Sequence, residues 1–208
     1  MVRILFAALL ISAASASASP ALPSFEFSAA NLQSTIAAMR ASQVKAKAGN
    51  IGPQLTNMAW DLERAEREAS RLRNDLRWLL QRVRSHQQGN GRPDNDPSLR
   101  WDVQRLTRDL AQLTRDAQYR VNDLRFLSSQ AEKDETLIPA ASRLVDGARR
   151  FKDTTNWLLM DARFAYFDLM RAGFTFEGMD LDRDSRDIDA RAQDLQTESE
   201  KVLAKIKG

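Results

Sequence analysis

Apolar and small residues recur at alternating spacings of three and four through most of this chain, and this pattern constrains the fold more than any other feature. It is typical of long helices that pack side by side, because an α-helix has about 3.6 residues per turn. After residue 53 the repeating positions are Leu55, Met58, Leu62, Ala65, Ala69, Leu72, Leu76, Leu79 and Val83. The next stretch repeats at Leu99, Val103, Leu106, Leu110, Leu113, Ala117, Val121, Leu124 and Leu127, with one extra residue after Ala117.

Two further stretches continue the pattern towards the C-terminus. One repeats at Ala141, Leu144, Ala148, Phe151, Thr155, Leu158, Ala162, Ala165, Leu169 and Ala172. The other repeats at Leu181, Ser185, Ile188, Ala192, Leu195, Ser199, Val202 and Ile206. A shorter N-terminal helix is marked by Leu32, Ile36 and Met39.

Breaks marked by glycine or proline lie at four places, residues 49–53, 89–97, 136–139 and 173–179. Such residues end helices, and Asp96 before Pro97 is a favourable start for the next one. Because short connections favour antiparallel neighbours, we expect an all-α fold: an elongated antiparallel (up-down) helical bundle with coiled-coil-like heptad packing. The expected boundaries are a short N-terminal helix and linker over 19–53 and a four-helix bundle over 54–208.

A long coiled-coil dimer is the alternative architecture. It requires a narrow apolar seam, whereas further apolar residues flank the repeating positions here. These residues are Trp60, Trp78, Leu80, Trp101, Phe126, Trp157, Phe164 and Phe167. We interpret them as widening the buried face, which favours the intramolecular bundle and does not exclude dimerisation of it.

The first 18 residues have the features of a signal peptide. A positive Met1-Val2-Arg3 precedes the apolar run 4–11, and small residues with A-x-A patterns follow at 12–19. We expect cleavage after Ala18 and a periplasmic or secreted mature protein. The chain has no cysteine and no N-x-S/T sequon, which fits bacterial export better than a eukaryotic secretory route.

Charge is dense but nearly balanced, with 31 basic and 28 acidic residues. This balance argues against nucleic acid as a partner, and alternating acids and arginines argue against binding to a membrane surface. Acids recur every seven residues at Asp61, Glu68 and Asp75, and at Asp102, Asp109, Asp116 and Asp123. We interpret these rows as salt-bridged helix flanks, because arginines lie three or four residues away.

The sequence contains no pattern that predicts catalysis. With one histidine, His86, the chain cannot supply the two Glu-x-x-His pairs of a di-iron bundle. Asp180-x-Asp182-x-Asp184 begins like a calcium loop, but Ser185 replaces the glycine of the turn and Arg191 the final glutamate. We therefore predict no metal site, no resident cofactor and no enzymatic activity.

One arrangement gives a cofactor hypothesis. His86 lies near the end of its helix, and in a bundle that end would meet Met170 and Met179. Histidine and methionine at one end of a bundle resemble the cytochrome b562 type, and this resemblance implies haem bound without covalent attachment. The alternative is a solvated histidine with methionines in the core.

A short motif in the stretch 99–127 bears on binding. Leu106-Thr107-Arg108-Asp109-Leu110 begins like the L-T-x-x-Q motif of a periplasmic α-helical chaperone family, but Leu110 stands in place of the glutamine. The comparison keeps chaperone-like binding among the hypotheses. We predict an exported, non-enzymatic bundle that acts as an interaction, adaptor or chaperone-like component of the cell envelope, with a protein partner or self-association. The haem carrier is the alternative.

Overall fold

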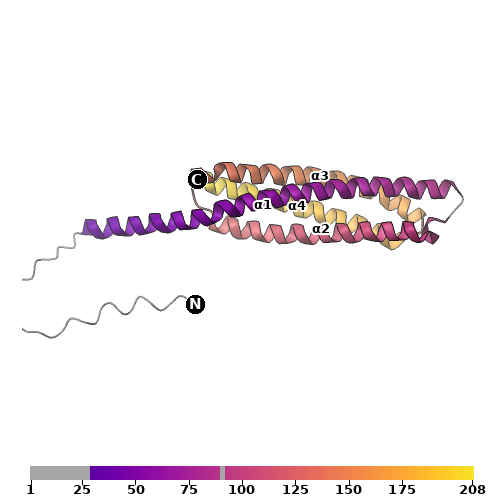
Figure 1. Ribbon diagram of the computed structural model, residues 1–208, viewed down its shortest axis with the longest axis horizontal. Coiled ribbons are helices and arrows are strands. Elements are labelled where there is room, and N and C mark those ends of the chain that lie inside the picture. The colour runs from indigo at the N-terminus through magenta and orange to yellow at the C-terminus, as the bar shows by residue number, and fades with distance from the viewer. Residues whose placement is uncertain (1–28, 90–91) are drawn as a thin grey trace, which may run out of the picture. The chain divides into compact units, whose positions relative to one another are not determined.

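The computed structural model describes the backbone of residues 29–89 and 92–208, and the side chains from residue 51 onwards within these ranges. The predicted signal peptide lies outside the described residues. The described chain forms four α-helices and two short 3₁₀ helices (Figure 1). They are α1 (Ala29–Gln88), η1 (Pro93–Asn95), α2 (Pro97–Gln130), η2 (Glu135–Leu137), α3 (Ile138–Arg171) and α4 (Thr175–Lys207). The chain divides into two units at residue 41, and everything below concerns residues 42–208.

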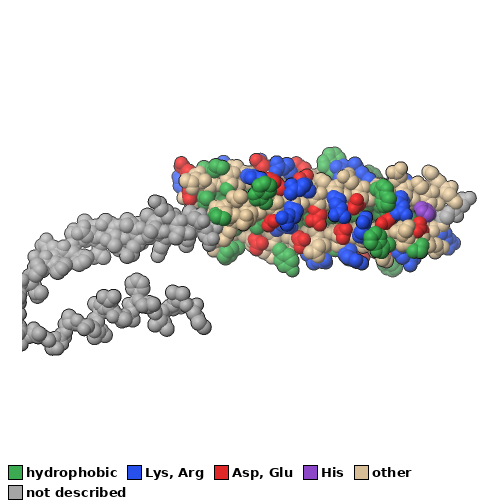
Figure 2. All heavy atoms as spheres, viewed as in Figure 1, with side chains coloured by type: hydrophobic (Ala, Val, Ile, Leu, Met, Phe, Trp, Pro, Cys, Tyr) green, Lys and Arg blue, Asp and Glu red, His purple; other side chains and the backbone are tan. Residues whose placement is uncertain are grey.

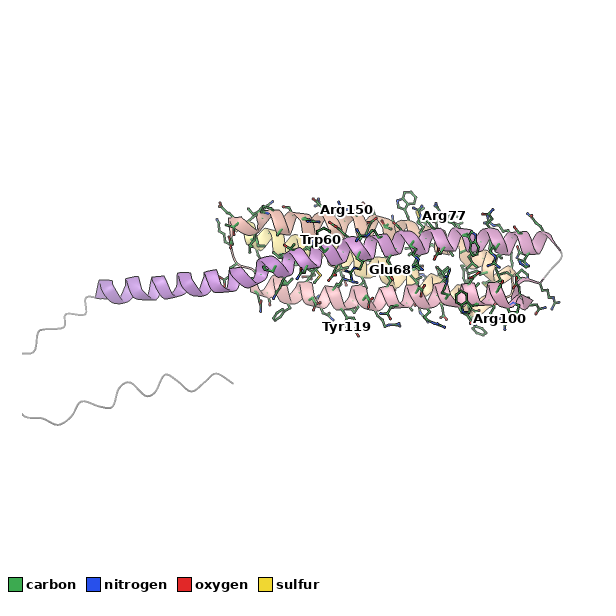
Figure 3. All side chains as sticks on the ribbon, in the orientation of Figure 1. Trp60, Glu68, Arg77, Arg100, Tyr119 and Arg150 are labelled. Carbon is green, nitrogen blue, oxygen red and sulfur yellow. The ribbon has the colours of Figure 1, made fainter. Side chains whose placement is uncertain are left out.

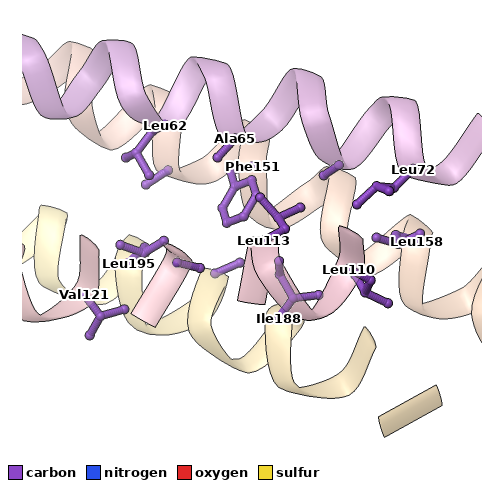
Figure 4. Close-up of a cluster of buried hydrophobic side chains, with 14 of the residues drawn as sticks. Leu62, Ala65, Leu72, Leu110, Leu113, Val121, Phe151, Leu158, Ile188 and Leu195 are labelled. Carbon is purple, nitrogen blue, oxygen red and sulfur yellow. The ribbon is translucent and has the colours of Figure 1, made fainter. Parts of the chain in front are cut away.

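Packing of these helices confirms the predicted all-α bundle. From Leu55 to Ile206, every position of the three-four repeat is buried, including the polar Thr155, Ser185 and Ser199. Phe151 is fully buried, and Figure 4 shows its ring among Leu62, Ala65 and Leu113. Removing such apolar surface from water is the main force that holds helices of this kind together.

Ion pairs show which helices are neighbours of α1 and in which direction they run. Towards α2 the pairs are Arg82–Asp102, Asp75–Arg105 and His86–Asp96, whose numbers rise in one helix as they fall in the other. Towards α3 the pairs are Glu63–Arg143, Arg73–Asp161 and Arg84–Asp168, whose numbers rise together. Helix α1 therefore runs opposite to α2 and in the same direction as α3.

Helix α4 has the same two neighbours. The side chains of Thr114 and Lys205 link α2 and α4 through the backbone oxygens of Asp184 and Ser128, in rising order along both helices. Arg149–Glu200 and Thr155–Asp189 link α3 and α4 in opposite order. The ring order is thus α1, α2, α4, α3, and the chain crosses between diagonal helices when it passes from α2 to α3.

The helix break predicted at residues 49–53 is wrong, because α1 continues through Pro53. Proline removes one helical hydrogen bond and normally bends or ends a helix. Here Ile51 and Leu55 are buried on either side of it, and the Thr56 hydroxyl donates to the Gly52 carbonyl at 3.0 Å. We attribute the continuation of α1 through the proline to the burial of Ile51 and Leu55 in the core.

The break predicted at 173–179 is shorter than expected, since α4 begins at Thr175. Gly173 takes a φ of 91°, and the Phe174 amide donates to the Leu169 carbonyl at 2.9 Å. These features are typical of a helix end closed by glycine. The Phe174 side chain is buried and fills the end of the core between α3 and α4.

The widened apolar face expected from flanking residues is also wrong for seven of its eight members. Only Leu80 is buried. The other seven are 51 to 68% exposed: Trp60, Trp78, Trp101, Phe126, Trp157, Phe164 and Phe167. At each of them the neighbouring helices leave half or more of the side chain in water.

Candidate functional site

His86 lies at the end of α1 and contacts the start of α2. Its Nε2 is 3.0 Å from Oδ2 of Asp96. Asp96 is the N-cap of α2, because its Oδ1 accepts hydrogen bonds from the amides of Ser98 and Leu99. The hydrogen bond from the Ser98 hydroxyl is the main cause that lowers the Asp96 pKa, with a smaller contribution from the nearby histidine. His86 thus joins the ends of two consecutive helices.

Met170 and Met179 lie at the same end of the bundle, on the last turn of α3 and the first turns of α4. Both point to solvent, at 39% and 53% exposed. The interior at this end is filled by other side chains, namely Val83, Leu99, Leu169 and Phe174. The three residues of the haem hypothesis share one end, and each lies on the surface rather than on the buried face.

The four tryptophans of the chain belong to the seams around α1. Each ring lies 4.2 to 5.3 Å from an arginine guanidinium, and each of these arginines also pairs with a carboxylate. The groups are Trp60–Arg143–Glu63, Trp78–Arg82–Asp102, Trp101–Arg105–Asp75 and Trp157–Arg73–Asp161. Figure 3 labels Trp60 on α1 and Arg150 of α3, which also pairs with Glu63 at 3.7 Å. These rings support contacts of α1 with its neighbours.

The rows of acids lie on the flanks of the helices, and some of these acids form the ion pairs that the sequence predicts. Asp75 and Asp102 pair with arginines of the facing helix, while Asp116 accepts a hydrogen bond from Gln112. Figure 2 shows acidic and basic side chains interspersed over the visible face rather than separated by sign. The described residues contain no group of three or more His, Cys, Asp or Glu placed to hold a metal ion.

In the part of the chain whose side chains are described, eight other large hydrophobic side chains are exposed, two on α2 (Tyr119 and Phe126) and six on α3 and α4. The six are Met160, Phe164, Phe167, Met170, Phe176 and Met179. Phe176 is 80% exposed, more than any other large hydrophobic side chain among the described residues. Neighbouring exposed apolar residues of this kind are typical of binding surfaces.

A groove lies between the end of α3 and the start of α4, which we call the end groove. It has a volume of about 490 Å³ and is lined by Tyr166, Phe176, Met179, Asp180, Asp182, Arg183 and Arg186. Tyr166 also packs edge-on against Phe167, with ring centroids 5.2 Å apart. The lining therefore has an aromatic and thioether part (Tyr166, Phe176 and Met179), which we call the apolar wall, and a charged part from α4, which we call the charged wall.

Gly178 explains why Phe176 and Met179 flank this groove. A Cβ atom at Gly178 would lie 3.4 Å from Leu169 Cβ and 3.5 Å from the Tyr166 carbonyl oxygen. The first turns of α4 therefore lie close against α3, and Gly178 is buried at the contact. Phe176 and Met179 are displaced to the exposed sides of this contact.

The charged wall is largely neutralised within itself. Arg183 pairs with Asp180 at 3.0 Å and with Asp184 at 3.1 Å, and Arg186 pairs with Asp182. Burial raises the pKa of Asp184, and the hydrogen bond from Arg183 opposes that change. Asp180, Asp182 and Asp184 lie within helix α4 and not in a loop, so the incomplete calcium pattern has no loop geometry. The groove offers an apolar wall beside paired charges.

A second, smaller pocket of about 300 Å³ lies between α1 and α2, lined by Gln54, Asn57, Met58, Asp61, Asp123, Phe126 and Leu127. None of the described helices has a stretch apolar enough to cross a membrane. No family model, curated protein or solved structure matches this chain. Fold and site together define it as an all-α helical-bundle protein with an exposed groove at one end, lined by apolar and charged side chains.

The sequence predicts Met179 as a site residue, but for a haem. It does not predict Phe176, because the residues at 173–179 indicate a turn. The signal that could have found the groove is the run Phe174-Thr175-Phe176, in which two aromatic residues two positions apart point to different sides of a helix start.

Proposed function

We propose that this protein is a non-enzymatic interaction protein that binds apolar polypeptide segments in the end groove, as an adaptor or chaperone-like component of the cell envelope. The observation that carries the proposal is the exposure of Phe176 and Met179 on one wall of the groove. Leaving such side chains in water is unfavourable, and contact with an apolar segment would remove that cost.

Methionine suits a surface that must accept more than one segment. Its side chain is unbranched and polarizable, so it adapts to differently shaped apolar partners. The pairing of Arg183 and Arg186 with acids leaves little net charge beside the apolar wall. Shape and hydrophobicity, rather than charge, would therefore select what binds.

The proposal is tested with a permanently unfolded, reduced and carboxymethylated model protein that carries a fluorescent label. Fluorescence anisotropy should give saturable binding to the wild-type bundle. Changing Phe176→Ser together with Met179→Ser should raise the Kd at least about tenfold, because such anchors each contribute more than about 1 kcal/mol. Binding that is unchanged in this double variant would refute the end groove as the site.

A matched control changes two exposed aromatic residues on another helix. Tyr119→Ser with Phe126→Ser removes comparable surface from α2, and Figure 3 shows Tyr119 on that helix. The control should bind within about twofold of wild type. Loss of binding in the control alone would move the site to the pocket beside Phe126.

We further propose that the protein is exported from the cytoplasm. The apolar run, the A-x-A pattern before Ser19 and the absence of cysteine support a bacterial periplasmic or secreted location. In that compartment a bundle that binds exposed apolar segments would meet unfolded or partly assembled envelope proteins. Fractionation of cells that produce the full chain tests this location, and retention in the cytoplasm would contradict it.

A further inference from the structure

A second exposed surface runs along the outward face of α3 and is separate from the end groove. Six residues follow one another there at spacings of four, three, four, three and four: Asp153, Trp157, Met160, Phe164, Phe167 and Arg171. All six are exposed, and the four apolar members are 44 to 68% exposed. At about 1.5 Å per residue this stripe is about 27 Å long. We call it the α3 stripe.

The spacings between the residues of the α3 stripe are symmetric about its centre, so they are the same from either end. If a second α3 lies alongside it in the opposite direction, Met160 faces Phe164 of the second copy and Trp157 faces Phe167 of the second copy. Each apolar residue then meets another apolar residue, as the seam positions of antiparallel coiled coils do. A two-fold axis near Ala162 relates the two helices, which is the symmetry of most homodimers.

The two ends of the stripe carry opposite charges. In the same register Asp153 faces Arg171 of the second copy, and the reverse pair forms at the other end. Neither residue has an ion-pair partner among the described residues, whereas the neighbouring Asp161 and Asp168 both pair with arginines of α1. Parallel alignment would instead place Asp153 beside Asp153 of the second copy and Arg171 beside Arg171 of the second copy. Repulsion between these like charges disfavours the parallel dimer.

From this self-complementarity we infer that the α3 stripe binds the same stripe of a second copy of the chain in antiparallel register, forming a two-fold dimer. Arg73 covers one face of the Trp157 ring, at 5.3 Å, and the ring remains 51% exposed for the second copy. The end groove shares no residue with the stripe, although the two surfaces adjoin where Tyr166 packs against Phe167.

One residue works against the pairing in a way that can be measured. Arg163 is exposed at the side of the stripe, close to the two-fold axis, where it lies beside Arg163 of the second copy. Like charges at this place weaken association. The change Arg163→Gln should therefore tighten the dimer, and looser association in that variant would contradict the register.

Cysteine crosslinking tests the register directly, because the chain has no cysteine of its own. Asp153→Cys and Arg171→Cys are prepared separately and mixed under mild oxidation. The mixture should form a disulfide-linked dimer, while each variant alone should stay largely unlinked, since its two sulfurs lie at opposite ends of the stripe. Efficient linking of Asp153→Cys with itself would indicate parallel pairing, and no linking in the mixture would refute the dimer.

Charge reversal gives a second test that a folding defect cannot imitate. In sedimentation equilibrium, Asp153→Arg and Arg171→Asp should each raise the dimer Kd at least about tenfold, and the double variant should restore it to within about threefold. Asp187→Arg, an exposed change on α4, should leave the Kd unchanged. A monomeric wild type, or a double variant no tighter than the singles, would overturn the inference. The Phe176 and Met179 variants should still dimerise.

Discussion

The Phe151 side chain supports the centre of the bundle, and its removal is expected to be costly. Phe151 is fully buried and belongs to the same hydrophobic core as residues of the facing helices. Phe151→Ala leaves a cavity that the surrounding leucines fill only in part, so we expect a loss of about 3 to 5 kcal/mol in the free energy of unfolding. For a unit of this size each kcal/mol lowers the Tm by about 2 to 4 °C, so the Tm should fall by about 6 to 20 °C.

The assay is urea unfolding followed by circular dichroism at 222 nm on wild type and variant, with the slope of the transition compared as well as its midpoint. Phe126→Ala is the matched control, because it removes the same group from a side chain that is 59% exposed on α2. The control should cost less than about 1 kcal/mol. If Phe151→Ala also cost less than about 1 kcal/mol, the packing of α3 against the other helices would be wrong.

Three further predictions concern charge, cofactor and processing. Burial raises the pKa of Asp184 in the folded protein, so folding favours the protonated carboxyl over the ionised one. The stability gained from the protonated carboxyl is present at low pH and is lost as the pH rises through the folded-state pKa. Asp184→Asn should therefore raise the Tm at pH 7, with a gain that shrinks towards pH 3, and a gain that is independent of pH would contradict this reasoning. Haem titrations of wild type and His86→Ala should give the same absorption in the Soret region, because His86 already pairs with Asp96. A Soret band that is present in wild type and lost in His86→Ala would support the haem carrier instead. Mass spectrometry of the exported protein should place its N-terminus at Ser19, and a mass that retains residues 1–18 would refute the predicted cleavage.

The seam positions were predictable because burial at intervals of three and four follows directly from helix geometry. Leu76, Leu124, Leu158 and Leu195 all lie in the core for this reason. The polar Thr155 was placed there by spacing alone, and its hydroxyl is satisfied by the Lys152 carbonyl at 2.9 Å. Spacing therefore predicted burial better than residue type did.

Residues beside the seam could not be assigned in this way. Leu80 and Trp78 both flank the repeat of α1, yet Leu80 is buried and Trp78 is half exposed. Which flank is covered depends on the ring order of the helices, and that order depends on contacts between helices far apart in sequence. For the same reason the sequence predicts Phe164 and Phe167 on the buried face, whereas they lie exposed on the α3 stripe.

The end groove was hidden by local turn signals. Gly173 does mark a turn, as its φ of 91° shows, but Gly178 is helical and buried because α4 packs closely on α3 there. Glycine thus has two different roles five residues apart, and only the tertiary contact distinguishes them. Pro53 is a similar case, because core packing on both sides carries α1 through it.

Methyl NMR of the methionines tests whether the end groove is the binding surface. The protein is labelled with ¹³C-methyl methionine and titrated with the unfolded model protein, and Met58, Met160 and Met179 are followed separately. We predict that the Met179 signal shifts or broadens saturably, while Met58, buried between α1 and α2, and Met160, on the α3 stripe, stay in place. Saturable binding with an unmoved Met179 signal would contradict the proposed function.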